Sequence, residues 1–179
     1  MKTQKSTLGF WISPITKLLG VALLLINSFY WSIPEMAEYV ASAYSGISPS
    51  HYTLTATNRF LGWLITTLQI AVLTYGLFTV ANIFRDFSKG IWFATSFSNK
   101  LKRFGISLLI FSLLSPIVQV LTGFALTYTN TPKTERMIIL SFNIDGKGAT
   151  IFLIGILLIL MGKVITEATR LADENSQII

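Results

Sequence analysis

The sequence predicts an all-α membrane protein with four transmembrane helices, and both its composition and four long apolar stretches lead to that prediction. Of the 179 residues, 52% are hydrophobic and only 12% are charged, and the mean hydropathy is +0.62. An average soluble domain is about 25% charged, so this chain has too few charged residues to cover a soluble globule. The composition therefore indicates that the main partner of the chain is the lipid bilayer.

Each apolar stretch is long enough for a transmembrane helix, which needs about 20 mostly apolar residues. Backbone N–H and C=O groups in lipid must bond within the protein, which favours helices. No charged residue lies near the centre of any stretch. The predicted single domain, residues 1–179, has spans at 15–33, 60–83, 104–128 and 149–165, external loops at 34–59 and 129–148, a cytoplasmic loop at 84–103 and a cytoplasmic tail at 166–179.

Lysine and arginine residues indicate the orientation, because they are enriched in cytoplasmic loops. Ten of the 14 Lys and Arg residues lie in the amino end, the loop 84–103 and the tail. Both chain ends are therefore expected in the cytoplasm. The tripeptide at 41–43 resembles a signal-peptide cleavage site, but it lies too far beyond the first apolar stretch. We expect the first helix to stay uncleaved.

The first external loop is expected to begin with a short helix on the membrane surface. Pro34 and Glu35 are helix-start signals, and Gly46 and Pro49 end the helical pattern. Residues 51–58 alternate as a short strand does, and residues 137–144 are rich in strand-forming side chains. These two segments could pair as a small external β element.

Basic and aromatic residues concentrate in the cytoplasmic loop. One interpretation is a docking platform for a soluble partner or for anionic lipid, and the other is an anchor that holds two helices in register. Glu174 or Asp173 of the tail could contact this loop. The candidate docking residues are Arg85, Lys89, Gly90, Trp92, Phe93, Lys100, Lys102 and Arg103 in the loop and Glu174 and Asn175 in the tail.

Three amide side chains, Asn27, Gln69 and Gln119, lie within predicted spans. They could line a path for a small molecule or an ion, but bonds between helices are the interpretation that we favour, because no charged residue accompanies them. Glycines at 148, 155 and 162 recur every seven residues and form a smooth stripe. Such a stripe favours close packing, either within the chain or against a second protein.

Residues for chemistry are scarce. There is no cysteine and one histidine, which excludes disulfides, thiol catalysis and zinc sites with several Cys or His ligands. No nucleotide-binding or hydrolase motif occurs, and no acidic residue lies within a span. We expect no enzyme activity, no cofactor, no metal and no direct contact with nucleic acid.

Two segments together resemble a known family. In 84–105 an aromatic pair precedes Gly90 and Phe93, and the segment 167–179 contains Ala168, Leu171 and the pair Glu174-Asn175. This pattern resembles domain of unknown function 2975, which groups small bacterial inner-membrane proteins of four helices. The resemblance implies an inner-membrane location and association with a small helix-turn-helix regulator.

Three functional hypotheses follow. The first is a non-enzymatic membrane regulator or sensor that acts through its cytoplasmic loop and tail. The second is a small transporter or export accessory subunit with a polar site among its helices. The third is a structural subunit that binds another membrane protein through its glycine stripe. Oligomeric state and ligand stay open.

Overall fold

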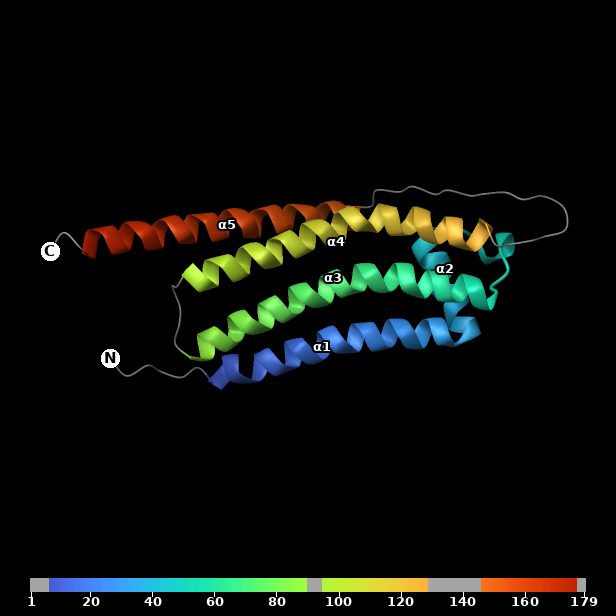
Figure 1. Ribbon diagram of the computed structural model, residues 1–179, viewed down its shortest axis with the longest axis horizontal. Helices are drawn as coiled ribbons and strands as arrows, with labels where there is room; N and C mark the ends of the chain where they lie inside the picture. Colours follow the sequence, from blue (N-terminus) through green and yellow to red (C-terminus); the bar gives the residue numbers. More distant parts are fainter. Residues whose placement is uncertain (1–6, 90–94, 129–145, 177–179) are drawn as a thin grey trace.

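The computed structural model describes residues 7–89, 95–128 and 146–176. These residues form helices almost throughout, and four of the helices are long and apolar enough to cross a membrane. The elements are α1 (Thr7–Ser32), α2 (Pro34–Ser45), the short 3-10 helix η1 (Pro49–His51), α3 (Ala56–Ser88), α4 (Thr95–Tyr128) and α5 (Gly146–Ser176), as Figure 1 shows. The chain is a small multi-pass membrane protein.

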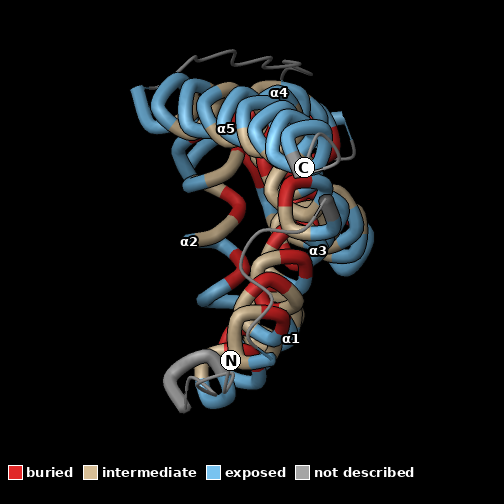
Figure 2. The backbone as a smooth tube through the Cα atoms, turned by 90° about the vertical axis from the view of Figure 1, so that its left-hand side faces the viewer, coloured by how far each residue is buried: buried red, intermediate tan, exposed pale blue. Residues whose placement is uncertain are grey.

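The four long helices form an open, curved layer rather than a closed bundle (Figure 2). Over the described residues, α1 packs along α3, α3 along α4 and α4 along α5, and no other pair of long helices packs extensively. The short α2 contacts α1 and α4 on the same side of the layer. Consequently α5 lies at one edge of the layer and α1 at the other.

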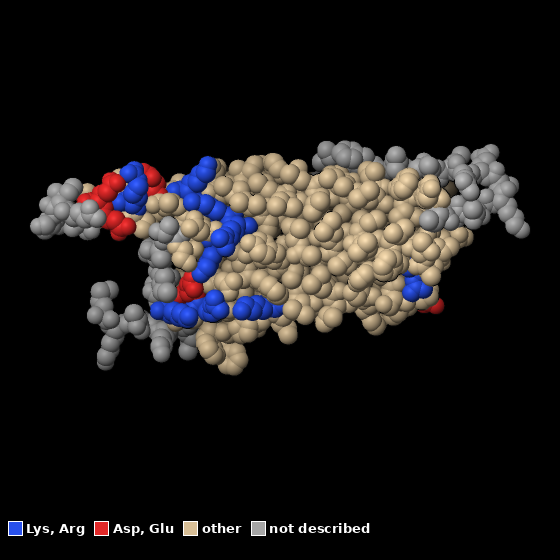
Figure 3. Space-filling view, in the orientation of Figure 1, with Lys and Arg blue, Asp and Glu red and all other residues tan. Residues whose placement is uncertain are grey.

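The two ends of the layer differ in charge. The described part of the chain starts and finishes at the same end, which we call the inner end (Figure 1). Lys and Arg side chains gather there, whereas the outer end, where α2 lies, shows little charge (Figure 3). Basic residues near the inner end are Lys17, Arg85, Lys89, Lys100, Lys102, Arg103, Lys163 and Arg170.

The short helix predicted in the first external loop is confirmed. Pro34 occupies its first turn, and Gly46 ends it in the left-handed conformation with φ of 70°. Ala37 and Ala41 are fully buried, so α2 packs onto the long helices through small side chains. The buried Tyr52 hydroxyl donates to the Glu38 carbonyl at 3.1 Å, and burial raises the pKa of Tyr52 to about 12.

The strand predicted at residues 51–58 is wrong. The helix η1 ends at His51, and α3 already begins at Ala56. Thr55 caps α3, because its hydroxyl accepts from the backbone N–H of Asn58 at 3.3 Å. Asn58 also donates from its amide to the Leu126 carbonyl at 3.3 Å, which anchors this turn to α4. The other predicted strand segment, 137–144, lies outside the described residues.

Glycines allow α4 and α5 to approach closely. The added Cβ of an alanine at Gly105 would lie 2.6 Å from the Gly155 carbonyl oxygen, and one at Gly155 would lie 2.9 Å from the Gly105 oxygen. One heptad along, Gly162 faces the Ser98 carbonyl and the stem of Lys102. The stripe at 155 and 162 therefore packs within the chain.

This contact also sets the position of α5 along α4. Gly162 lies opposite Ser98, which is only the fourth residue of α4, yet α5 continues to Ser176. At 1.5 Å per residue, α5 therefore extends about 15 Å beyond the first residue of α4. Figure 1 shows this projection at the inner end.

We predict that Gly105→Ala destabilises the protein by about 1–3 kcal/mol, because the new Cβ meets backbone atoms that cannot move aside. The melting temperature in detergent micelles measures the effect. Gly146→Ala is the matched control, since its added Cβ has no described atom within 4 Å. Equal melting temperatures for the two variants would contradict the close α4–α5 contact.

Candidate functional site

Most of the candidate docking residues lie together at the inner end of the layer. Arg85 and Lys89 are exposed at the end of α3, and Arg103 is exposed in the first turns of α4. Glu174 and Asn175 are exposed near the end of α5. Gly90, Trp92 and Phe93 lie outside the described residues.

One of the predicted docking cations, Lys100, takes part in an ion pair between helices. Its ammonium group contacts the carboxylate of Asp86, which is only 9% exposed, and so joins α4 to α3. Sequence reasoning assigned no role to Asp86. One sequence feature could have pointed to an ion pair, because Asp86 is the only acidic residue between 84 and 103, a segment rich in Lys and Arg.

Polar contacts also join α4 to α5 at the inner end. The buried Ser98 hydroxyl donates to the Gly162 carbonyl at 2.6 Å and contacts the hydroxyl of Thr166. The stem of Lys102 packs across Gly162. Lys100 and Lys102 therefore contribute to helix packing, whereas Arg85, Lys89 and Arg103 keep exposed side chains.

The predicted contact between Glu174 and the basic loop does not occur in the described part of the chain. Glu174 instead accepts from Arg170 at 2.8 Å, and Arg170 also pairs with Glu167. All three side chains are more than half exposed. These pairs follow the i,i+3 and i,i+4 spacing of neighbours on one helix, so they stabilise the end of α5 without a partner from α3 or α4.

An apolar stripe runs along α5 on the side opposite these contacts with α4. Its residues recur at intervals of three and four, which places them on one helix face. Every one of them is exposed, and Leu171 still exposes 49% of its surface beyond the start of α4. We call this face the α5 stripe, and its members are Leu157, Met161, Val164, Ala168 and Leu171.

Two of the intramembrane amides, Asn27 and Gln69, take part in different helix interfaces. The Asn27 amide, 5% exposed, donates to the Thr67 hydroxyl at 2.9 Å and accepts from Thr66, which joins α1 to α3. Gln69 donates to the Phe111 carbonyl at 3.4 Å, which joins α3 to α4. Gln119 is half-buried on α4. Asn27 and Gln69 thus form separate bonds between helices.

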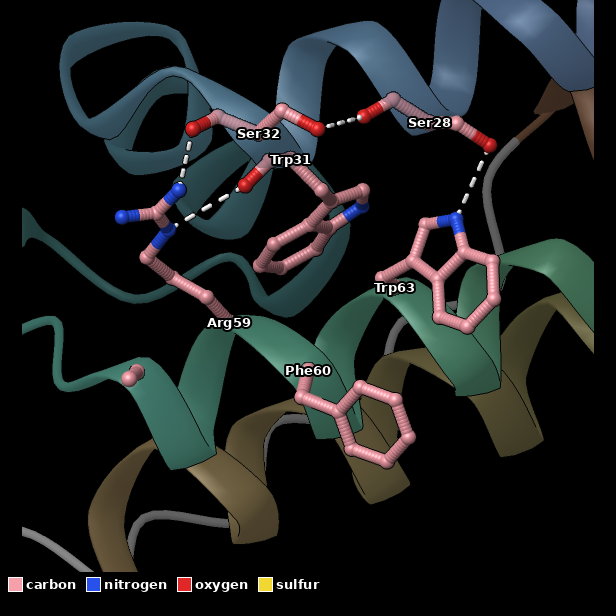
Figure 4. A pocket seen from close by; sticks show the side chains of 7 residues that line it. Ser28, Trp31, Ser32, Arg59, Phe60 and Trp63 are labelled. Carbon is pink, nitrogen blue, oxygen red and sulfur yellow. Dashed lines mark hydrogen bonds between the residues drawn. The ribbon is translucent and has the colours of Figure 1, made fainter.

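Sequence reasoning missed a pocket at the outer end, between the last turn of α1 and the first turns of α3 (Figure 4). Its volume is about 420 Å³. Arg59 reaches across it to the end of α1, where its Nε donates to the Trp31 carbonyl at 3.1 Å. The signal was Arg59 itself, the only Lys or Arg in loop 34–59. Lining residues are Ser28, Trp31, Ser32, Ala56, Arg59, Phe60 and Trp63.

A second groove, of about 360 Å³, lies between α3 and α4 and is almost entirely apolar. Its walls include Leu68, Tyr75 and Ile110, and Arg103 lies among its lining residues. Among the residues that the structure describes, no group of three His, Asp or Glu side chains could hold a metal ion. The outer pocket and this apolar groove thus lie apart from the charged inner end, except that Arg103 belongs to both the groove and that end.

The sequence was compared with protein families, with curated proteins and with solved structures, and nothing matches it. No family assignment therefore supports the resemblance noted in the sequence. The fold and the site define a small multi-pass membrane protein with four long apolar helices.

We predict that Asp86→Asn and Lys100→Met each destabilise the protein by about 1–3 kcal/mol, because each leaves a partly buried partner without its counter-charge. The double variant should lose less than the sum of the two. Melting temperatures of the four proteins in detergent measure the coupling. Additive losses would show that the ion pair does not hold α3 to α4.

Proposed function

We propose that this chain is a non-enzymatic regulator or sensor of the cell inner membrane, which holds a soluble partner at its inner end. In this proposal the inner end faces the cytoplasm, as the excess of Lys and Arg there favours. The observation that carries the proposal is the projection of α5 beyond α3 and α4, with the α5 stripe exposed along it.

The physical argument concerns the part of the stripe beyond the bilayer. Within lipid an exposed apolar side chain is solvated, but Ala168 and Leu171 follow the charged Lys163 and Glu167 and lie past the start of α4. Apolar residues exposed on a helix face in water favour a partner helix or groove. Charged residues at the rim of such a surface then set which partner fits.

The rim is of mixed charge. Arg170, Glu167 and Glu174 flank the stripe on α5 itself. The exposed cations Arg85 and Arg103 lie elsewhere at the inner end, on α3 and α4. A partner with an apolar helix face and acidic flanks suits this surface. A small helix-turn-helix regulator, the partner class that the family resemblance implies, is the candidate that we propose.

The two other hypotheses gain no support from the described residues. Asn27 and Gln69 bond separately across two helix interfaces, which does not suit a shared transport site. Gly155 and Gly162 are covered by α4, so they are not available to a second membrane protein. We therefore advance the regulator alone.

We expect a green fluorescent protein fused after Ile179 to fluoresce, because the proposal places the carboxyl end in the cytoplasm. Alkaline phosphatase fused after Pro49 should be active, because that enzyme needs the oxidising side of the membrane. Activity in whole cells measures both. A dark carboxyl-terminal fusion together with an inactive phosphatase would reverse the proposed orientation.

We predict that Leu171→Asp weakens capture of the soluble partner about tenfold, the loss that corresponds to 1.4 kcal/mol of interface energy. The measurement is the amount of partner that purifies with the tagged chain in mild detergent, with the regulator of a neighbouring gene tested first. Thr169→Asp is the matched control, since position 169 lies about 160° around the helix from Leu171 and off the stripe.

A second pair of variants tests the exposed cations of the inner end, which lie apart from the stripe. The double variant Arg103→Gln/Arg85→Gln should also reduce capture of the partner. The reduction should be largest at low salt concentration, where surface charges are least screened. Lys147→Gln, at the opposite end of α5, should have no effect. Equal capture by all variants, with insertion unaltered, would refute the docking role of the inner end.

A further inference from the structure

The outer pocket combines one cation with an aromatic wall. The cation is Arg59 of α3, and the wall is formed by Trp31 of α1 with Phe60 and Trp63 of α3 (Figure 4). The Phe60 and Trp63 rings lie 5.8 Å apart between centroids and are tilted by 37°. The Trp63 indole N–H donates to the Ser28 hydroxyl at 3.0 Å, which fixes the ring against α1.

The guanidinium of Arg59 is held rigidly but keeps donors to spare. Its Nε and one terminal nitrogen donate to the carbonyls of Trp31 and Ser32, at the carboxyl end of α1. The other terminal nitrogen has no bond in Figure 4. Over the described ranges no carboxylate pairs with Arg59, in contrast to Lys100 and Arg170. An arginine fixed in this way is preorganised for an oxyanion, because no side-chain freedom is lost on binding.

The position of the pocket identifies the class of anion. Arg59 marks the outer limit of the apolar part of α3, which is the depth of lipid phosphates in a bilayer. From the pocket an exposed apolar row descends α3 at intervals of four residues, through Phe60, Leu64 and Leu68. Phe60 exposes 59% of its surface. A ligand with a phosphate and an acyl chain fits both the cation and this row.

We propose that the outer pocket binds a phospholipid of the adjacent leaflet, with its phosphate on Arg59 and its glycerol and acyl chain against Phe60 and Trp63. The hydroxyls and indole rings at this depth are the groups that settle at the membrane–water boundary. An anionic lipid binds more tightly than a zwitterionic one, since it carries no ammonium group to offset the charge of its phosphate. A water-soluble phosphate compound shares the anion but not the chain, so it does not use the apolar row.

The test uses tryptophan fluorescence in vesicles. Trp11→Phe and Trp92→Phe leave Trp31 and Trp63 as the only tryptophans, both of which line the pocket. Phosphatidylglycerol with brominated acyl chains, mixed into phosphatidylcholine, quenches a tryptophan that it touches. We expect brominated phosphatidylglycerol to quench at lower mole fractions than brominated phosphatidylcholine does.

In this background, Arg59→Gln should reduce the preference for phosphatidylglycerol about fivefold, the factor that corresponds to one basic residue at a membrane surface. Arg103→Gln is the matched control, because it removes an arginine from the groove between α3 and α4 and leaves the outer pocket intact. Phe60→Ala, which removes an exposed ring and no bond to α1, should weaken quenching by both brominated lipids and tests the pocket independently of folding.

Two outcomes would overturn the proposal. If quenching by the two lipids is equal and Arg59→Gln and Phe60→Ala change nothing, then the pocket does not select a lipid. If inorganic phosphate shifts the emission of Trp31 and Trp63 while brominated phosphatidylglycerol shows no preference, then the site takes a soluble anion instead. Neither outcome changes the loss of partner capture that we expect for Leu171→Asp. A failure of the lipid proposal can therefore be distinguished from a failure of the proposed function.

Discussion

In a bilayer, apolar side chains gain little by leaving lipid for another helix, so helix association depends on close packing and on hydrogen bonds between helices. Each of the three interfaces between long helices contains at least one such bond from a side chain to a backbone carbonyl of the next helix, near the middle of the layer or at its inner end. The donors are Thr74 to Gly20 between α1 and α3, Gln69 to Phe111 between α3 and α4, and Ser98 to Gly162 between α4 and α5. A helical carbonyl keeps a second lone pair for this purpose. The layer is therefore joined at each seam by a polar contact and small residues.

The two ends of the layer then perform different tasks. At the outer end, polar and aromatic groups close the turn between α1 and α3, and Arg59 caps α1 where the carbonyls lack helical partners. At the inner end, the ion pair of Asp86 with Lys100 holds α3 to α4, while α5 continues alone. The outer end is thus the more enclosed, and the inner end presents free helix surface.

The sequence predicted the features that depend on neighbouring residues. Four spans follow from the length of the apolar stretches, and α2 follows from Pro34 and Gly46. The strand at 51–58 was wrong because the capping of α3 by Thr55 prevailed over a weak alternation of residue types. In both cases the deciding interactions lie within a few residues along the chain.

The features that sequence reasoning missed depend on distant pairs. The partners of Asp86 and Ser98 lie 14 and 64 residues away, so they become visible only when the register of the helices is known. The open layer was not predictable either, because a transmembrane helix is apolar on the faces that meet lipid as well as on those that meet protein. For the same reason, the sequence could not distinguish the aromatic residues of the outer pocket from the aromatic residues that commonly lie at a membrane surface.

The order in which the long helices pack has a consequence for how the protein assembles during synthesis. Since α3 packs on α1, α4 on α3 and α5 on α4, each long helix finds its main neighbour already in the bilayer when it leaves the ribosome. Only α2 completes its packing later, because it contacts α4 as well as α1. Assembly can thus proceed helix by helix from the amino end, with no late rearrangement of the long helices.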